Sequence, residues 1–163
     1  MALTDTFLKL KGIEGESKRK GHEGEIEIES WSVGAHNASS IGSGSGGGVS
    51  RGQITGLTIS TRLKKESPKL LEYCASGQHV PEATLTAIRA AGTDEGQPYL
   101  KYILKEAFIS SVQFAGDGPD ELPIVSMTLD ANVVKLEYIP QGDKGEALSP
   151  VVMTWDQAKG TKG

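Results

Sequence analysis

The 163-residue sequence is poor in cysteine, in aromatic residues and in long apolar runs. Its single cysteine, Cys74, cannot form an internal disulfide bond, so nothing indicates an oxidising compartment. No apolar run approaches the roughly 20 residues that a membrane-spanning helix needs, and the N-terminus has no secretory signal peptide. We therefore expect a protein that is cytoplasmic by default and does not insert into a membrane.

The sequence also lacks an excess of positive charge. It has 17 basic and 21 acidic residues, for a formal net charge of −4. Binding to phosphate backbones needs a basic field, so nucleic acid is not an expected partner. The one basic cluster, Lys18-Arg19-Lys20, stands among glutamates and indicates a solvated loop.

Patterns that carry catalysis or metal binding are missing as well. The three histidines, His22, His36 and His79, are far apart and lack the spacing of a metal site. No G-x-S-x-G sequence is present to anchor a hydrolase triad. Gly42 to Gly47 formally match G-x-G-x-x-G, but an alternating strand follows where a dinucleotide-binding fold has a helix. We predict no catalytic residue, no metal and no cofactor.

Glycine, in contrast, is abundant. The chain has 21 glycines, about twice the number expected at average usage. Many lie in a segment at about 35–52 whose composition is that of a flexible loop. The length of the chain favours one domain, and the residues before this segment are too few to form a core of their own. The segment is therefore not a linker between domains, and a loop of about 20 residues inside a compact domain is usually functional.

Apolar and polar residues alternate through most of the rest of the chain, as in half-buried strands. Phe108, Val112 and Phe114 are expected on one face of a strand, and Val125, Met127 and Leu129 on one face of another. About eight strands of this kind close as a barrel or pack as a two-sheet sandwich. The runs are 26–33, 54–61, 83–91, 99–105, 108–114, 125–129 and 134–138.

One segment breaks the alternation and predicts a short helix at about 68–76. Ser67 suits the N-cap, Pro68 the first helical position, and Gly77 the residue after the last turn. Leu70, Leu71 and Cys74 would share the face that lies on the sheet. We expect Cys74 to be a small buried apolar residue and not a nucleophile.

The chain resembles the Hcp (haemolysin-coregulated protein) family, the inner-tube subunit of bacterial type VI secretion systems. Residues 5–34 carry a hydrophobic first strand, the sequence GIEGES, a histidine before the acidic strand, and Ser-Trp-Ser. Further similarity lies in SPKLLEYCASGQHVPEATLT (67–86), in YLKYILKEAFISSV (99–112), in YIPQG (138–142) and in Trp155-Asp156. The resemblance covers nearly the whole chain.

The resemblance implies a single tube domain at 1–163, mainly β: a β-barrel formed by two sheets, with one short flanking helix and a C-terminal tail at about 140–163. It implies a hexameric ring with a wide pore, and rings that stack into a tube inside a contractile sheath. The implied partners are further copies of the chain, a VgrG-type spike protein, sheath and baseplate components, and effector proteins in the lumen. The protein would be cytoplasmic until the sheath contracts and then reach the extracellular space or a target cell. We expect no effector domain fused at the C-terminus.

Two sets of site residues follow. The glycine-rich loop is expected to contact the next ring or subunit through Ile41, Gly42, Ser43, Gly44, Ser45, Gly46, Gly47 and Gly48. Ser32 is a hypothetical lumen and cargo contact. If Trp31 packs inward, its neighbours Ser30 and Ser32 point the other way, which requires a bulge near residue 30 because Ile26 and Ile28 have the same parity as the serines.

An alternative function from a different class is a monomeric β-sandwich that binds a small ligand or a glycan. Such a module needs an apolar pocket with aromatic platforms, and aromatic residues make up only 6% of the chain.

Overall fold

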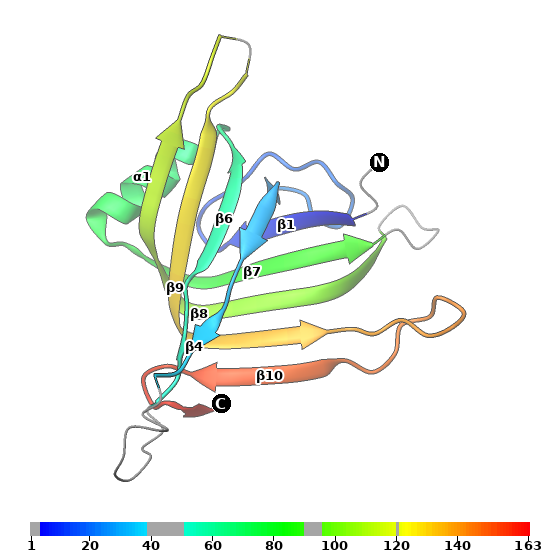
Figure 1. The fold of residues 1–163 in the computed structure, drawn as a ribbon. Helices are drawn as coiled ribbons and strands as arrows, with labels where there is room; N and C mark the ends of the chain where they lie inside the picture. The colour runs from blue at the N-terminus through cyan, green and yellow to red at the C-terminus, as the bar shows by residue number, and fades with distance from the viewer. Residues whose placement is uncertain (1–3, 39–50, 90–95, 120) are drawn as a thin grey trace.

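The computed structural model describes residues 4–38, 51–89, 96–119 and 121–163, and it shows a mainly β protein with one short helix (Figure 1). This confirms the expected fold class at that level. The helix is α1 (Ser67–Ser76). The strands of the described residues are β1 (Thr4–Leu10), β2 (Ile26–Ile28), β3 (Ser30–Ser32), β4 (Ala35–His36), β5 (Gln53–Ile54), β6 (Leu57–Arg62), β7 (His79–Arg89), β8 (Gln97–Ala115), β9 (Ile124–Tyr138), β10 (Val151–Asp156) and β11 (Thr161–Lys162).

Nine of these strands form one antiparallel sheet, whose main order is β11-β10-β9-β8-β7-β1-β2. Strand β9 has two partners on the side away from β8. Its first half pairs with β6 and its second half with β10. Strand β3 pairs with the other edge of β6, while β4 and β5 form a separate two-stranded ribbon.

The core follows the predicted alternation in most strands. Val125, Met127 and Leu129 of β9 are fully buried, and Ile26 and Ile28 of β2 are buried on either side of the exposed Glu27. Each such side chain stabilises the fold by about 2 kcal/mol relative to an exposed one.

Strand β8 departs from the predicted phase at Ser110. Ile109 pairs with Leu129 and Ser111 with Thr128, so Ser110 is an extra residue in the strand. Phe108 therefore lies on the face opposite Val112 and Phe114, and it is 41% exposed. The expectation that all three share one face is wrong, because the bulge reverses the alternation between them.

The helix begins and ends near the predicted residues, and Gly77 ends it in a left-handed conformation with φ 72°. Ser67 is not the N-cap. It is the first residue of α1, and its Oγ accepts a hydrogen bond from the Lys64 N–H at 3.0 Å. Leu70 is fully buried, but Leu71 is 48% exposed, so the predicted apolar face is narrower than expected. Cys74 is only partly buried, packed against the core.

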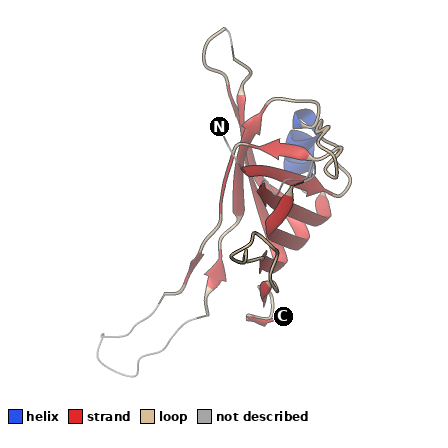
Figure 2. Ribbon diagram, turned by 90° about the vertical axis from the view of Figure 1, so that its right-hand side faces the viewer, coloured by secondary structure: helices blue, strands red, loops and turns tan. Residues whose placement is uncertain are grey.

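The helix lies on one side of the sheet, and it is too short to cross a bilayer (Figure 2). In the part of the chain that the structure describes, no helix has the length and apolar character of a membrane span.

Candidate functional site

The alternation of buried and exposed residues breaks just before β3, as the proposed lumen contact of Ser32 requires. Strand β2 ends at Ile28, and the next two residues, Glu29 and Ser30, are both exposed. Trp31 is partly buried against the core, and Ser32 is exposed like Ser30. The two serines therefore point away from the core side of the sheet.

Ser32 belongs to a larger surface that crosses four strands. Ser32 pairs with Thr58 of β6, Thr58 with Thr128 of β9, and Thr128 with Ser111 of β8. The next row joins the neighbouring polar residues in the same way. We call this surface the neutral face, and its residues are Ser30, Ser32, Thr58, Ser60, Ser111, Gln113, Ser126 and Thr128. None of them is charged.

The local sequence pattern indicated only two residues of this face, Ser30 and Ser32. The polar halves of TIST, VSMT and SSVQ alternate with buried residues, and this alternation was the available signal. The register that aligns these segments depends on strand pairing between residues as far apart in the chain as Thr58 and Thr128, which are 70 positions apart, and the sequence pattern does not give this register.

The predicted contact residues Ile41 to Gly48 lie outside the described residues. The strands that flank them are described. Ala35 pairs with Ile54 and His36 with Gln53, and the Thr55 N–H donates to the Gly34 carbonyl at 2.8 Å. Figure 2 shows this β4–β5 ribbon leaving the body of the molecule.

Strand β10 carries exposed apolar side chains in succession. Val151, Val152 and Met153 are 64%, 48% and 40% exposed, and neighbouring residues of a strand point to opposite faces. Strand β11 pairs only with Trp155 and Asp156, so within the described residues no strand covers the outer edge of Val151–Met153. An open edge with apolar groups on both faces favours association.

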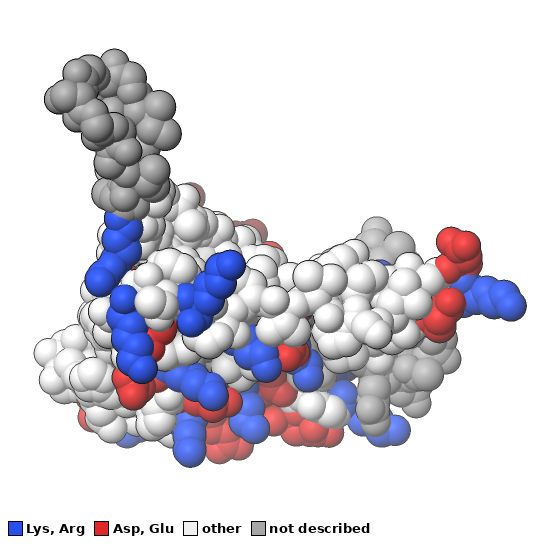
Figure 3. All heavy atoms as spheres, turned by 90° about the horizontal axis from the view of Figure 1, so that it is seen from below, with Lys and Arg blue, Asp and Glu red and all other residues white. Residues whose placement is uncertain are grey.

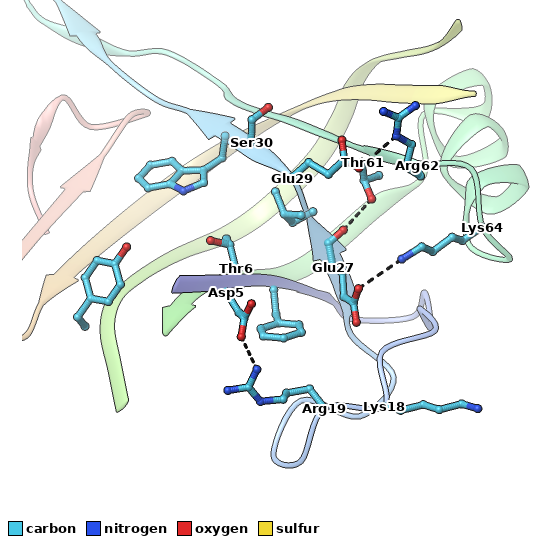
Figure 4. Close-up of a pocket in the computed structure, with 14 residues that line it drawn as sticks. Asp5, Thr6, Lys18, Arg19, Glu27, Glu29, Ser30, Thr61, Arg62 and Lys64 are labelled. Carbon is cyan, nitrogen blue, oxygen red and sulfur yellow. Dashed lines mark hydrogen bonds and ion pairs between the residues drawn. The ribbon is translucent and has the colours of Figure 1, made fainter. Parts of the chain in front are cut away.

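A hollow of about 900 Å³ lies beside β1, β2 and β6 (Figure 4). The Arg62 Nε lies 3.1 Å from the Glu29 Oε1, and the Lys64 Nζ lies 3.7 Å from the Glu27 Oε2. Arg19 pairs with Asp5 at its other end. Partly exposed pairs of this kind contribute less than about 1 kcal/mol each, and they leave this hollow largely charged rather than apolar.

Charges of both signs are also mixed on the face that Figure 3 shows, where lysines and arginines stand among aspartates and glutamates. This face has no extended area of one sign. It has no resemblance to the basic surface that nucleic acids bind.

Two of the three histidines, His22 and His79, contact aromatic side chains within the fold. The His22 ring stacks on Phe7 with 4.8 Å between ring centroids, and its Nδ1 lies 2.9 Å from the Glu25 Oε2. His79 is the first residue of β7 and contacts the Phe108 ring. Among the residues that the structure describes, no three His, Cys, Asp or Glu side chains gather as metal ligands.

Two buried polar groups have shifted pKa values. Burial raises the pKa of the Tyr102 hydroxyl to about 12. Burial also raises the pKa of the Glu66 carboxyl, an effect that its own backbone amide and Lys64 partly offset. Within the described residues, neither the Tyr102 hydroxyl nor the Glu66 carboxyl makes a hydrogen bond to another side chain.

Comparison with known proteins identifies the Hcp family, which the sequence resembles, over most of the chain. The family model "Type VI secretion system effector, Hcp" matches residues 7–138. The protein hcp1 of Pseudomonas aeruginosa is 36% identical over 153 residues, which cover 93% of this chain and 94% of that protein.

Solved structures agree. The crystal structure of Hcp1 from Salmonella typhimurium has 29% identity and a TM-score of 0.81, and the match covers 99% of this chain and 100% of that one. A structure described as a type six secretion system protein has 26% identity and a TM-score of 0.89, with 98% and 99% of the two chains covered. The chain therefore belongs to the Hcp family of type VI secretion systems, whose members are secreted tube components and not enzymes.

Proposed function

We propose that this chain assembles into a homohexameric ring, and that these rings stack into the inner tube of a type VI secretion system. The observation that carries the proposal is the open edge of β10, where Val151, Val152 and Met153 are exposed. A ring of identical chains joins two different surfaces of each subunit. Contact with a second copy would cover this edge and remove its apolar area from water.

We further propose that the sheet closes into a β-barrel. The strand order links β9 to β2 through β8, β7 and β1, and links β9 to β3 through β6. Hydrogen bonds between β6 and the β2–β3 segment support closure. The Glu29 N–H donates to the Ser60 carbonyl at 2.9 Å, and the Thr61 Oγ1 donates to the Glu27 carbonyl at 2.7 Å.

Residues Ile41 to Gly48 are proposed to contact the neighbouring ring or subunit. The support comes from their composition and from the β4–β5 ribbon, which carries both ends of this segment away from the body (Figure 2). Glycine permits backbone conformations that a tight contact between chains requires.

Ser32 and the rest of the neutral face are proposed to line the lumen and to contact effector proteins. An uncharged face of short polar side chains suits this role, because it binds different cargo weakly and leaves no unpaired charge against it. The further partners are a VgrG-type spike protein and the contractile sheath and baseplate. The protein stays in the cytoplasm until the sheath contracts and is then expelled.

Size-exclusion chromatography with light scattering, followed by negative-stain imaging, tests the proposal. We expect a species near six times the 17.2 kDa chain mass, seen as rings with an open centre. A monomer at every concentration and with every partner would contradict it and favour the ligand-binding module. The charged lining of the hollow beside β1 gives that alternative no support.

A further inference from the structure

The turn between β10 and β11 forms a compact hook, which we define as Asp156–Gly160. The Gly160 N–H donates to the Asp156 carbonyl at 2.8 Å, and the Lys159 N–H donates to the Asp156 Oδ1 at 2.9 Å. Gly160 has a φ of 65°, which favours glycine at this position. The hook therefore has a defined shape.

Gln157 of this hook bonds with its side chain to β5. Its Nε2 donates to the Ile54 carbonyl at 2.8 Å, and its Oε1 accepts from the Ile54 N–H at 3.3 Å. One side-chain amide thus bonds both backbone groups of one residue, as a neighbouring strand would. Gln157 occupies the edge of β5 that faces away from β4.

A second contact supports the first. The Arg51 Nη2 donates to the Lys159 carbonyl at 3.4 Å. Arg51 also lies against Gly160, where an added Cβ atom would collide with the Arg51 side chain. Any residue larger than glycine at position 160 would displace the arginine.

The hook is itself fixed to the body of the sheet. The Asn132 carbonyl of β9 accepts from the Gln157 N–H at 2.7 Å, and the Asn132 Oδ1 accepts from the Ala158 N–H at 3.2 Å. The Asn132 Nδ2 in turn donates to the Glu106 Oε2 of β8 at 2.8 Å. A continuous series of hydrogen bonds therefore runs from β8 through the hook to β5.

The ribbon needs such support. Strands β4 and β5 have two residues each and form a sheet separate from the nine-stranded one. An isolated two-stranded ribbon is at best marginally stable in water. Its direction must therefore be set by contacts at its base, and the hook supplies them.

We propose that Gln157 is a positioning residue: it holds Ile54 and so fixes the direction in which the β4–β5 ribbon leaves the sheet toward the neighbouring ring. This inference rests on the proposed function, because that function gives the ribbon its partner. Gln157 acts through Ile54 and does not itself contact the next ring.

The test compares Gln157→Met with the wild-type chain. Methionine keeps the length of the side chain and removes both hydrogen bonds to Ile54. We expect hydrogen exchange at the Ile54 amide to speed up by about five- to tenfold, since one hydrogen bond is lost there. The hexamer mass should stay unchanged. In a strain that produces only the Gln157→Met variant of this protein, the amount of secreted protein should fall severalfold. Gln78→Met, at an exposed residue outside the hook, is the matched control and should change none of the three.

Three results would overturn the inference. Unchanged exchange at Ile54 would show that Gln157 does not hold β5. Faster exchange with normal secretion would show that Gln157 does not position the ribbon. In that case the proposed role of the loop would still stand if shortening residues 42–48 blocked secretion. Normal secretion after that shortening would instead remove the loop from ring contact, and the positioning role would fail with it.

Discussion

Ser32 and Thr58 lie opposite each other in β3 and β6, and the Thr58 Oγ1 lies 3.1 Å from the Thr128 Oγ1 of β9. Three neighbouring strands thus present hydroxyl groups in one row on the neutral face. Within this face, hydroxyls satisfy one another or water, so the surface needs no charged partner to be stable. A charge introduced into the row would find no carboxylate or cation among the residues of this face.

Replacing Ser32 with arginine should therefore disturb cargo contact and leave assembly intact. Ser32 is exposed, so Ser32→Arg should leave the free energy of unfolding within about 0.5 kcal/mol of the wild type. Effector proteins that co-purify with the rings should decrease several-fold, measured by quantitative mass spectrometry against the hexamer.

The control places the same substitution on the helix. Ser76→Arg changes an exposed serine at the end of α1, away from the neutral face, and should retain cargo at the wild-type level. Equal cargo on Ser32→Arg rings and wild-type rings would exclude the neutral face as the cargo surface.

The sequence pattern predicts the buried residues of a strand best where only one phase of apolar and polar alternation fits the sequence. In β9, polar residues separate Val125, Met127 and Leu129, and all three are buried as predicted. In β8, three apolar residues stand in succession from Ala107 to Ile109, so two phases fit equally well. The bulge at Ser110 decides between them, and it arises from pairing with β9 and not from local sequence.

In the candidate site too, some features follow from the local sequence and others depend on contacts between distant segments. The break before Ser30 was predictable, because Trp31 demands the core and its serine neighbours then face away. The contact of Gln157 with Ile54 joins residues 103 positions apart. No local periodicity encodes a side-chain amide that acts as a strand partner, so this contact required the structure.

Shortening the glycine-rich segment tests its proposed contact with the next ring. Deletion of residues 42–48 should leave hexamers intact and sharply reduce stacking, because the remaining segment is too short to reach a neighbour. Stacking is read from sedimentation velocity at rising protein concentration and from secretion by the producing strain. Ser43→Gly with Ser45→Gly keeps the length and serves as control. Normal stacking in the deletion variant would refute the contact.

The β10 edge is expected to be a contact between subunits. Val151→Lys with Val152→Lys places one ammonium group on each face of this strand, where both side chains are exposed in the single chain. We expect a folded monomer in place of the hexamer, since burying either charge without a partner costs several kcal/mol. Light scattering reports the mass and circular dichroism the fold.

The matched substitution is Leu71→Lys, which removes an exposed apolar residue of α1. It should leave the hexamer mass unchanged if the helix face is free in the ring. Hexamers of normal mass in the β10 double variant would place the subunit contact elsewhere on the molecule.

The buried carboxyl of Glu66 predicts a pH-dependent stability. Burial raises its pKa in the folded chain, so the folded state binds the proton more tightly than the unfolded state. The unfolding free energy should therefore fall as pH rises from the ordinary glutamate range through this raised pKa. Neither Glu66 oxygen has a hydrogen-bond partner beyond its own backbone, so the buried charge is poorly compensated. Glu66→Gln removes this charge. It should raise the free energy of unfolding by about 1 kcal/mol at about pH 7.5 and by much less at about pH 4. Urea unfolding at one fixed protein concentration measures both values. Glu72→Gln on the exposed side of α1 should show no such pH-dependent gain, and an equal gain in the two variants would mean that the Glu66 charge carries no burial cost.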